Sequence, residues 1–148
     1  MHAQPTFATN PRPIAPRATV LVRKMAHSTS AGFPSPADDY IEDVLDLNRH
    51  LIAHGHEEAT YVLRVEGWSM IGAGIFDGDE VIVDRAKAPK ENSVVVAVVN
   101  GDLSIKRLQF RKGLPVLVAE NAHFTDREFK EGEELVIWGV VTRVLHKV

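Results

Sequence analysis

A hydrophobic pattern with a period of two most restricts how this chain can fold. Over residues 61–66 the odd positions are Tyr, Leu and Val, the even positions include Arg and Glu, and Gly67 ends the run. Such alternation is typical of a strand with one buried face. Five more segments rich in β-branched residues are predicted to be strands: 81–83, 94–99, 103–110, 115–119 and 135–145. Asn100-Gly101 is typical of a type I′ turn between two of them, so a mainly β fold is predicted.

The segment before these strands has a helical pattern instead. Ser35-Pro36-Ala37-Asp38 has the form of a helix start, with serine as the cap and proline at the first helical position. Apolar residues then recur at roughly helical spacing from Tyr40 to Ile52, and Gly55 follows. We expect one or two short helices here.

Residues 1–31 form a basic, proline-rich arm. They contain four Arg or Lys and no acidic residue, a charge of +4, so the remaining residues carry −7 of the net charge of −3. The arm shows little apolar periodicity and is predicted to be extended or mobile. A nucleic-acid contact and docking on the chain's own acidic body are the alternatives. The predicted division is therefore a flexible arm at 1–31 and a folded domain at 32–148.

Composition limits the class of protein. A chain of 148 residues that is 45% hydrophobic fits one globular domain. The absence of cysteine excludes disulfides, thiol chemistry and cysteine-ligated zinc. The apolar run Val94 to Val99 is far shorter than the roughly 20 residues of a membrane helix. We predict a soluble, cytoplasmic protein.

Ser69 follows the first predicted strand, and Lys106 lies inside a later one. A serine hydroxyl becomes nucleophilic when a base takes its proton, and a desolvated lysine can be that base. On strand alternation Lys106 shares a face with Ser104, Leu108 and Phe110, where burial would lower the lysine pKa. The pair predicts an enzyme. Serine and lysine at such a separation are common, however, and a turn serine with a surface lysine is the alternative.

Further motifs surround this pair. In chain order they are Gly32 to Tyr40, Asp46-Leu47-Asn48, Gly67-Trp68-Ser69-Met70, Asp77 to Asp84, Asn100 to Leu108 and Trp138 to Val141. In this order they resemble the self-cleaving serine-lysine family of LexA-type repressors and UmuD, peptidase family S24. The resemblance is closest to UmuD and spans about residues 31 to 148.

The resemblance implies a β-rich fold like the LexA C-terminal domain, with a short N-terminal helical segment, and a homodimer. It implies that Ser69 is the nucleophile, Lys106 the general base and Ala31-Gly32 the scissile bond, with the backbone N–H groups of Trp68 and Ser69 as oxyanion donors. Self-cleavage would follow contact with RecA filaments on single-stranded DNA in the SOS response. The cleaved body would then serve a UmuC-like translesion polymerase as an accessory subunit.

The arm is too short and too rich in proline for a helix-turn-helix domain, so sequence-specific DNA binding is not expected. A protein of a different class remains open, namely a non-catalytic dimeric interaction module that binds a polymerase or RecA. Retention of Ser69, Lys106 and Ala31-Gly32 together favours the peptidase, since a binding module needs none of them.

Other constellations in the sequence are weaker, and no cofactor or metal is expected. The histidines and glutamates of residues 50–58 are interpreted as a solvated helix end instead of a metal site. Nothing in the flanks of His123 supports a Ser-His-Asp arrangement with Ser69. The glycine pair of residues 72–74 lacks the strand-turn-helix context of a phosphate loop. Four aromatic residues are expected in the core: Trp68, Phe76, Phe110 and Trp138.

Overall fold

The structure, a computed structural model, describes residues 5–14, 21–25 and 41–148. The chain divides into two compact units, one made of residues 1–14 and 58–148 and the other of residues 15–57. No helix in the described ranges is long and apolar enough to cross a membrane.

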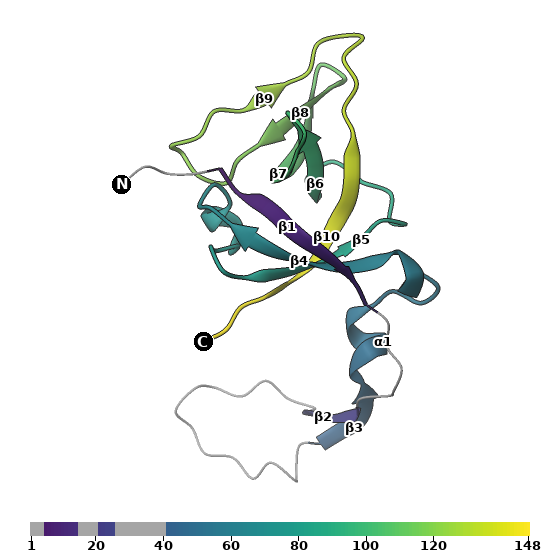
Figure 1. Cartoon of the computed structure of the whole chain (residues 1–148). Helices are drawn as coiled ribbons and strands as arrows, with labels where there is room; N and C mark the ends of the chain where they lie inside the picture. Colours follow the sequence, from purple (N-terminus) through teal and green to yellow (C-terminus); the bar gives the residue numbers. More distant parts are fainter. Residues whose placement is uncertain (1–4, 15–20, 26–40) are drawn as a thin grey trace. The chain divides into compact units, whose positions relative to one another are not determined.

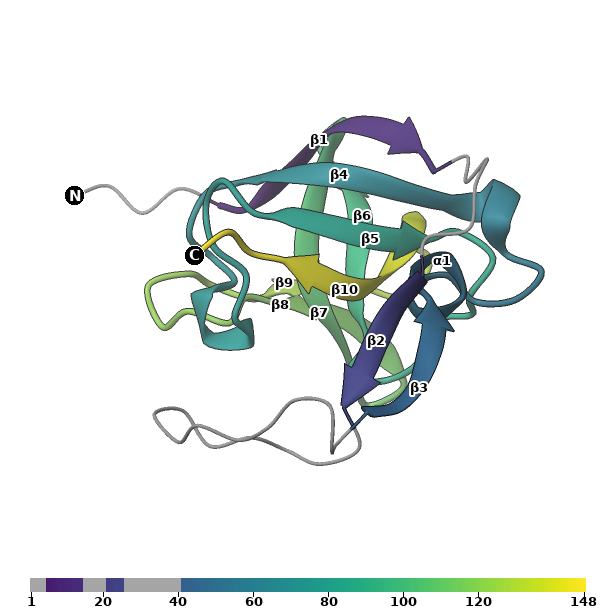
Figure 2. The ribbon, with the colours of Figure 1, turned by 90° about the horizontal axis from the view of Figure 1, so that it is seen from below.

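The larger unit is built on one antiparallel sheet of eight strands, in the order β1-β4-β5-β10-β6-β7-β8-β9 (Figure 1). β1 also pairs with β7, so the first six strands in that order close into a barrel. Figure 2 shows β1, β4, β5 and β10 side by side. The strand bounds are Phe7–Pro13 (β1), Thr60–Glu66 (β4), Glu80–Asp84 (β5), Val94–Val99 (β6), Asp102–Arg111 (β7), Leu114–Val118 (β8), Arg127–Glu128 (β9) and Ile137–Leu145 (β10).

The predicted mainly β fold, like that of the LexA C-terminal domain, is confirmed. All six strands predicted from alternation and β-branched content are present as β4 to β8 and β10. Asn100 and Gly101 have φ angles of 50° and 83°, the positive values that a type I′ turn requires between β6 and β7. Local turn chemistry and strand pattern thus agree over this hairpin.

The barrel buries two groups of apolar side chains. The first lies around β4 and β5 and includes Leu63, Val65 and Met70, each fully buried, together with Ala8 from β1. The second lies around β6, β7 and β8 and includes Leu108 and Leu117. Burial of this apolar surface is the main favourable term in the stability of the barrel.

β1 lies within the predicted arm and was not expected as a strand. It pairs with β4 from Phe7 opposite Glu66 to Pro13 opposite Tyr61. Of the alternatives for the arm, docking on the body describes residues 5–14 in this structure. Residues 26–40, which hold the predicted boundary and the Ala31-Gly32 bond, lie outside the described residues, so the division after residue 31 stays a prediction.

The smaller unit corrects the predicted helix. Residues 41–46 form a strand, β3 (Ile41–Asp46), which pairs antiparallel with β2 (Leu21–Met25). The helix α1 spans only Leu47–Leu51, and its N-cap Asp46 accepts a hydrogen bond from the backbone N–H of Asn48 at 3.0 Å. Helical spacing is a weak signal over so few residues, because pairing with a distant strand supplies competing backbone hydrogen bonds. The helix start predicted at residues 35–38 lies outside the described residues.

Three of the four aromatic residues predicted in the core are instead on the surface. Trp68, Phe76 and Phe110 expose 40%, 38% and 44% of their surface. Trp68 and Phe76 lie in loops, and Phe110 lies next to the end of β7, where a ring need not be covered. Trp138 packs against the core, with the ring of Tyr61 at 5.2 Å between centroids.

Candidate active site

The loop that follows β4 turns sharply at Gly67 and places Ser69 in a buried position at one end of the barrel. Gly67 has a φ of 101°, which a residue with a side chain rarely adopts, and its N–H donates to Asp77 Oδ1 at 2.8 Å. The hydrogen bond fixes the loop against the segment before β5. Ser69, two residues later, is fully buried.

Lys106 approaches Ser69 from β7. Its position is set by pairing with Val95 of β6, and its Nζ lies 3.1 Å from Ser69 Oγ. The ammonium is half-buried, and burial lowers the pKa of Lys106 because the charged form loses solvation. The ring of Phe124 also lies 5.4 Å from Nζ, measured to its centroid. A neutral amine here can take the proton of the Ser69 hydroxyl.

Asn121 holds the peptide unit that joins Trp68 to Ser69. Its Nδ2 donates to the Trp68 carbonyl at 2.9 Å, so the N–H of Ser69 points to the opposite side of that planar unit. The N–H groups of Trp68 and Ser69 form no hydrogen bond within the described part of the chain. They are therefore available to an oxyanion. Sequence reasoning missed Asn121, since no motif sets it apart and it lies 53 positions from Trp68.

The glycine pair after Ser69 has a packing role. The N–H of Gly72 donates to the Glu120 carbonyl at 2.8 Å, and a Cβ at this position would lie 2.7 Å from the same oxygen. Gly74 ends the short 3₁₀ helix Ile71–Ala73 with a φ of 76°. Gly72 thus lets the serine loop pack closely on the segment that carries Asn121, whereas Gly74 supplies a left-handed turn.

The N-terminal segment, residues 5–14, covers the serine. The N–H of Thr6 donates to Ser69 Oγ at 2.8 Å. The carbonyl of Thr6 accepts from the N–H of Ile105 at 3.0 Å and from Ser104 Oγ at 3.4 Å. Ser69 Oγ therefore contacts the lysine and a backbone N–H at the same time.

Other predicted residues lie apart from this pair or outside the described ranges. Ala31 and Gly32 are among the residues that the structure does not describe. His123 is exposed, and its backbone N–H donates to Asn121 Oδ1 at 3.0 Å. Over residues 5–14, 21–25 and 41–148, no three His, Asp or Glu side chains gather as a metal site requires. The catalytic roles of Ser69 and Lys106 stay predictions that this geometry supports.

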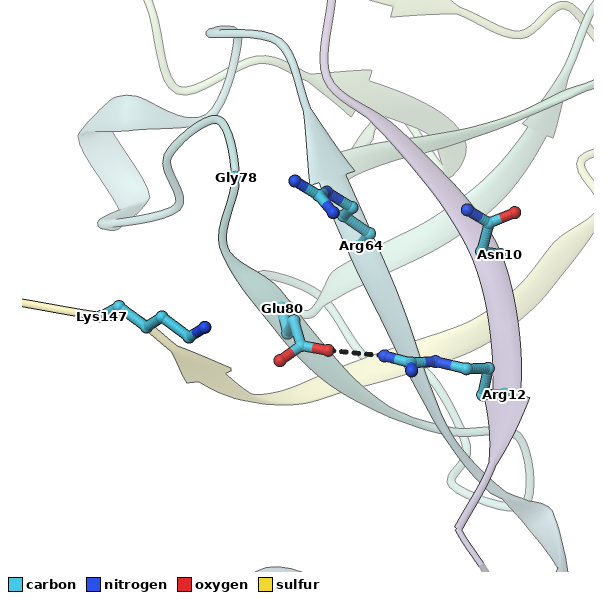
Figure 3. A pocket seen from close by; sticks show the side chains of 6 residues that line it. All are labelled: Asn10, Arg12, Arg64, Gly78, Glu80 and Lys147. Carbon is cyan, nitrogen blue, oxygen red and sulfur yellow. Dashed lines mark hydrogen bonds and ion pairs between the residues drawn. The ribbon is translucent and has the colours of Figure 1, made fainter.

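A polar cavity of about 590 Å³ lies at the other end of β1 (Figure 3). Arg12 reaches across it to Glu80 of β5, with 2.8 Å between Nη2 and Oε2. The remaining lining residues are Asn10, Arg64, Gly78 and Lys147. The lining contains neither Ser69 nor Lys106, and within it Arg12 of the arm pairs with Glu80 of the body.

Comparisons with known proteins place this geometry in context. Residues 24–142 match the family described as Peptidase S24-like. The protein ImpA of Escherichia coli is 41% identical over 124 residues, which cover 82% of this chain and 81% of ImpA. SamA of Salmonella typhimurium is 41% identical over 117 residues, 79% of each chain. The LexA repressor of Frankia alni is 37% identical over 119 residues, 80% of this chain and 45% of the repressor. The matched region includes both Ser69 and Lys106.

Proposed function

Because this chain is a UmuD-like member of the peptidase S24 family, we propose that it is a serine peptidase that cleaves its own Ala31-Gly32 bond. The observation that carries the proposal is the 3.1 Å between Ser69 Oγ and Lys106 Nζ, at a place where burial lowers the lysine pKa. A nucleophile and its base at hydrogen-bond distance are the minimum that acyl transfer requires.

The reaction follows from these groups. Ser69 Oγ attacks the carbonyl carbon of Ala31 while its proton moves to neutral Lys106 Nζ. The N–H groups of Trp68 and Ser69 hold the oxyanion, and the Lys106 ammonium protonates the amine of Gly32 as the peptide bond breaks. Water, deprotonated by the lysine, then hydrolyses the Ala31 ester and regenerates the serine. The substrate is tethered, so affinity for a free peptide is unnecessary.

The physiological role that we propose is the UmuD-like one. RecA filaments on single-stranded DNA stimulate cleavage in the SOS response, and the body from Gly32 onward forms a homodimer that supports a UmuC-like translesion polymerase in the cytoplasm. The motif resemblance over about residues 31 to 148 and the identity to ImpA and SamA support this role.

Incubation of the purified chain with RecA, single-stranded DNA and a nucleotide tests the proposal. Mass spectrometry should find a fragment that starts at Gly32. Ser69→Ala and Lys106→Ala should leave the chain intact, whereas Lys87→Ala, at an exposed lysine, should cleave like the unchanged protein. A folded chain that yields no such fragment would favour the non-catalytic dimeric module that binds a polymerase or RecA.

A further inference from the structure

We propose that the groove between β4 and β7, which ends at Ser69, is a binding site for an extended peptide with small alternate side chains. Residues 5–14 are its resident ligand, one that is not cut and that competes with the scissile segment. This inference rests on the proposed function, because it names what regulates access to the same serine. Self-cleavage then requires that the N-terminal segment leave the groove first.

The backbone of the N-terminal segment is bound on both sides, as an added strand would be. On one side it pairs with β4 from Phe7 to Pro13, and on the other Phe7 lies opposite Ser104 of β7. Thr6 adds three hydrogen bonds, to Ser69 Oγ, to the Ile105 N–H and to Ser104 Oγ. Main-chain hydrogen bonds of this kind give affinity for an extended segment largely independent of its sequence.

The bound segment is not placed for cleavage. Its Thr6 N–H donates to Ser69 Oγ, and an N–H donor is not an electrophile. This hydrogen bond also occupies a lone pair of Ser69 Oγ, and the attack on a carbonyl carbon uses a lone pair of that atom. Because Thr6 lies against Ser69 Oγ, the Ala31 carbonyl carbon must displace it to reach the nucleophile.

The side chains show what the groove selects. Thr6 and Ala8, two positions apart, are buried to 0% and 5% exposure, so the groove takes small side chains at alternate positions. Thr29-Ser30-Ala31, next to the predicted scissile bond, has the same Thr-X-Ala pattern as Thr6-Phe7-Ala8. The two segments therefore satisfy the same size requirement.

Thr6 is an imperfect occupant of its position. Its Oγ1 is buried and has no hydrogen-bond partner in the described structure. A buried hydroxyl without a partner weakens docking, and a side chain of the same shape without the hydroxyl escapes that cost. The Arg12–Glu80 ion pair at the far end of β1 is exposed and contributes little. The segment is thus held firmly by its backbone but remains displaceable.

Two substitutions should move the rate of self-cleavage in opposite directions. Ala8→Lys places an unpaired charge in the groove and should release the segment, which accelerates cleavage at least about tenfold. Thr6→Val keeps the shape, removes the unpaired hydroxyl and should slow cleavage about fivefold or more. The matched control Ala88→Lys lies in an exposed loop and should stay within about twofold.

A synthetic peptide of residues 5–14 extends this test. Added to the Ala8→Lys chain, it should restore slow cleavage, and the same peptide with Ala8→Lys should not. Thermal unfolding shows whether the Ala8→Lys chain is folded, and if it is not, Thr6→Val alone decides. Cleavage that is no faster in folded Ala8→Lys, or no slower in Thr6→Val, would overturn the proposal.

A measurement without cleavage separates this inference from the proposed function. In a Lys106→Ala chain, hydrogen exchange should find the amides of Thr6 and Ile105 protected, and Ala8→Lys should abolish the protection of Thr6. If the Thr6 amide is protected but the unchanged chain yields no fragment, the docked segment is retained and only the peptidase is rejected. An unprotected Thr6 amide would reject the docked segment whatever the protein does.

Discussion

The protonation state of Lys106 should control the rate of self-cleavage. Its ammonium is half-buried beside Ser69, and burial lowers its pKa from the ordinary value of about 10.4, because the neutral amine loses less solvation than the ammonium. Only the neutral form can accept the serine proton. Raising the pH therefore increases the active fraction, and the rate should rise with pH and level off above the lysine pKa.

The size of the effect follows from a single proton. Well below the pKa the neutral fraction, and with it the rate, grows about tenfold for each pH unit. The midpoint of the rise should lie below about pH 10.4, since burial lowers the pKa of Lys106. Docking of residues 5–14 scales the rate by the same factor at each pH and leaves this slope unchanged, because its contact to Ser69 is a backbone N–H that does not titrate in this range.

The assay is the appearance of the fragment that begins at Gly32, without any activator, over pH 6.5 to about 10.5. Lys106→Arg is the sharp control, since a guanidinium stays protonated throughout and should abolish both the rate and its rise. A flat profile for the unchanged chain, or a rising one for Lys106→Arg, would refute the assignment of lysine as the base.

Three further changes test how the fold supports the site. Asn121→Ala removes the donor to the Trp68 carbonyl and should slow cleavage about tenfold at unchanged thermal stability, as judged by fragment yield and an unfolding curve; an unchanged rate would contradict a positioning role. Gly67→Ala forces a side chain into a φ of 101° and should cost about 1–3 kcal/mol of unfolding free energy in a denaturant titration. Leu63→Ala empties a fully buried position and should cost about 2–5 kcal/mol in the same titration, and a loss below 1 kcal/mol would contradict the core described above.

Much of the barrel could be predicted from local patterns. The alternation over residues 61–66 gave β4, and Asn100-Gly101 gave the β6–β7 turn, because both signals are contained in a few neighbouring residues. The helix predicted between Tyr40 and Ile52 was wrong over residues 41–46, where pairing with β2 decides the conformation. The strand β1 was missed because its prolines argue against a strand, and its partners β4 and β7 lie far along the chain.

The candidate site divides in the same way. Ser69 and Lys106 were identified through flanking motifs, and the structure places their side chains in contact. Asn121 was not identified, since its amide acts on a carbonyl 53 residues away and leaves no local signal. Contact between Thr6 and Ser69 was also unforeseen, because a backbone N–H carries no mark of residue type. The contacts that could not be predicted are hydrogen bonds to or from backbone groups between residues far apart in the chain.

The order of β1 and its partners along the chain has a consequence for biosynthesis. Thr6 contacts Ser69 across 63 positions and Ser104 across 98, so a growing chain has β1 long before it has the strands that bind it. At about 5–20 residues per second, the wait from Thr6 to Ser104 lasts roughly 5 to 20 seconds. Lys106, which completes the catalytic pair, emerges one residue after Ile105, which anchors the Thr6 carbonyl. The base and the residue that anchors the covering segment thus become available together, and a nascent chain can fold with its site already closed.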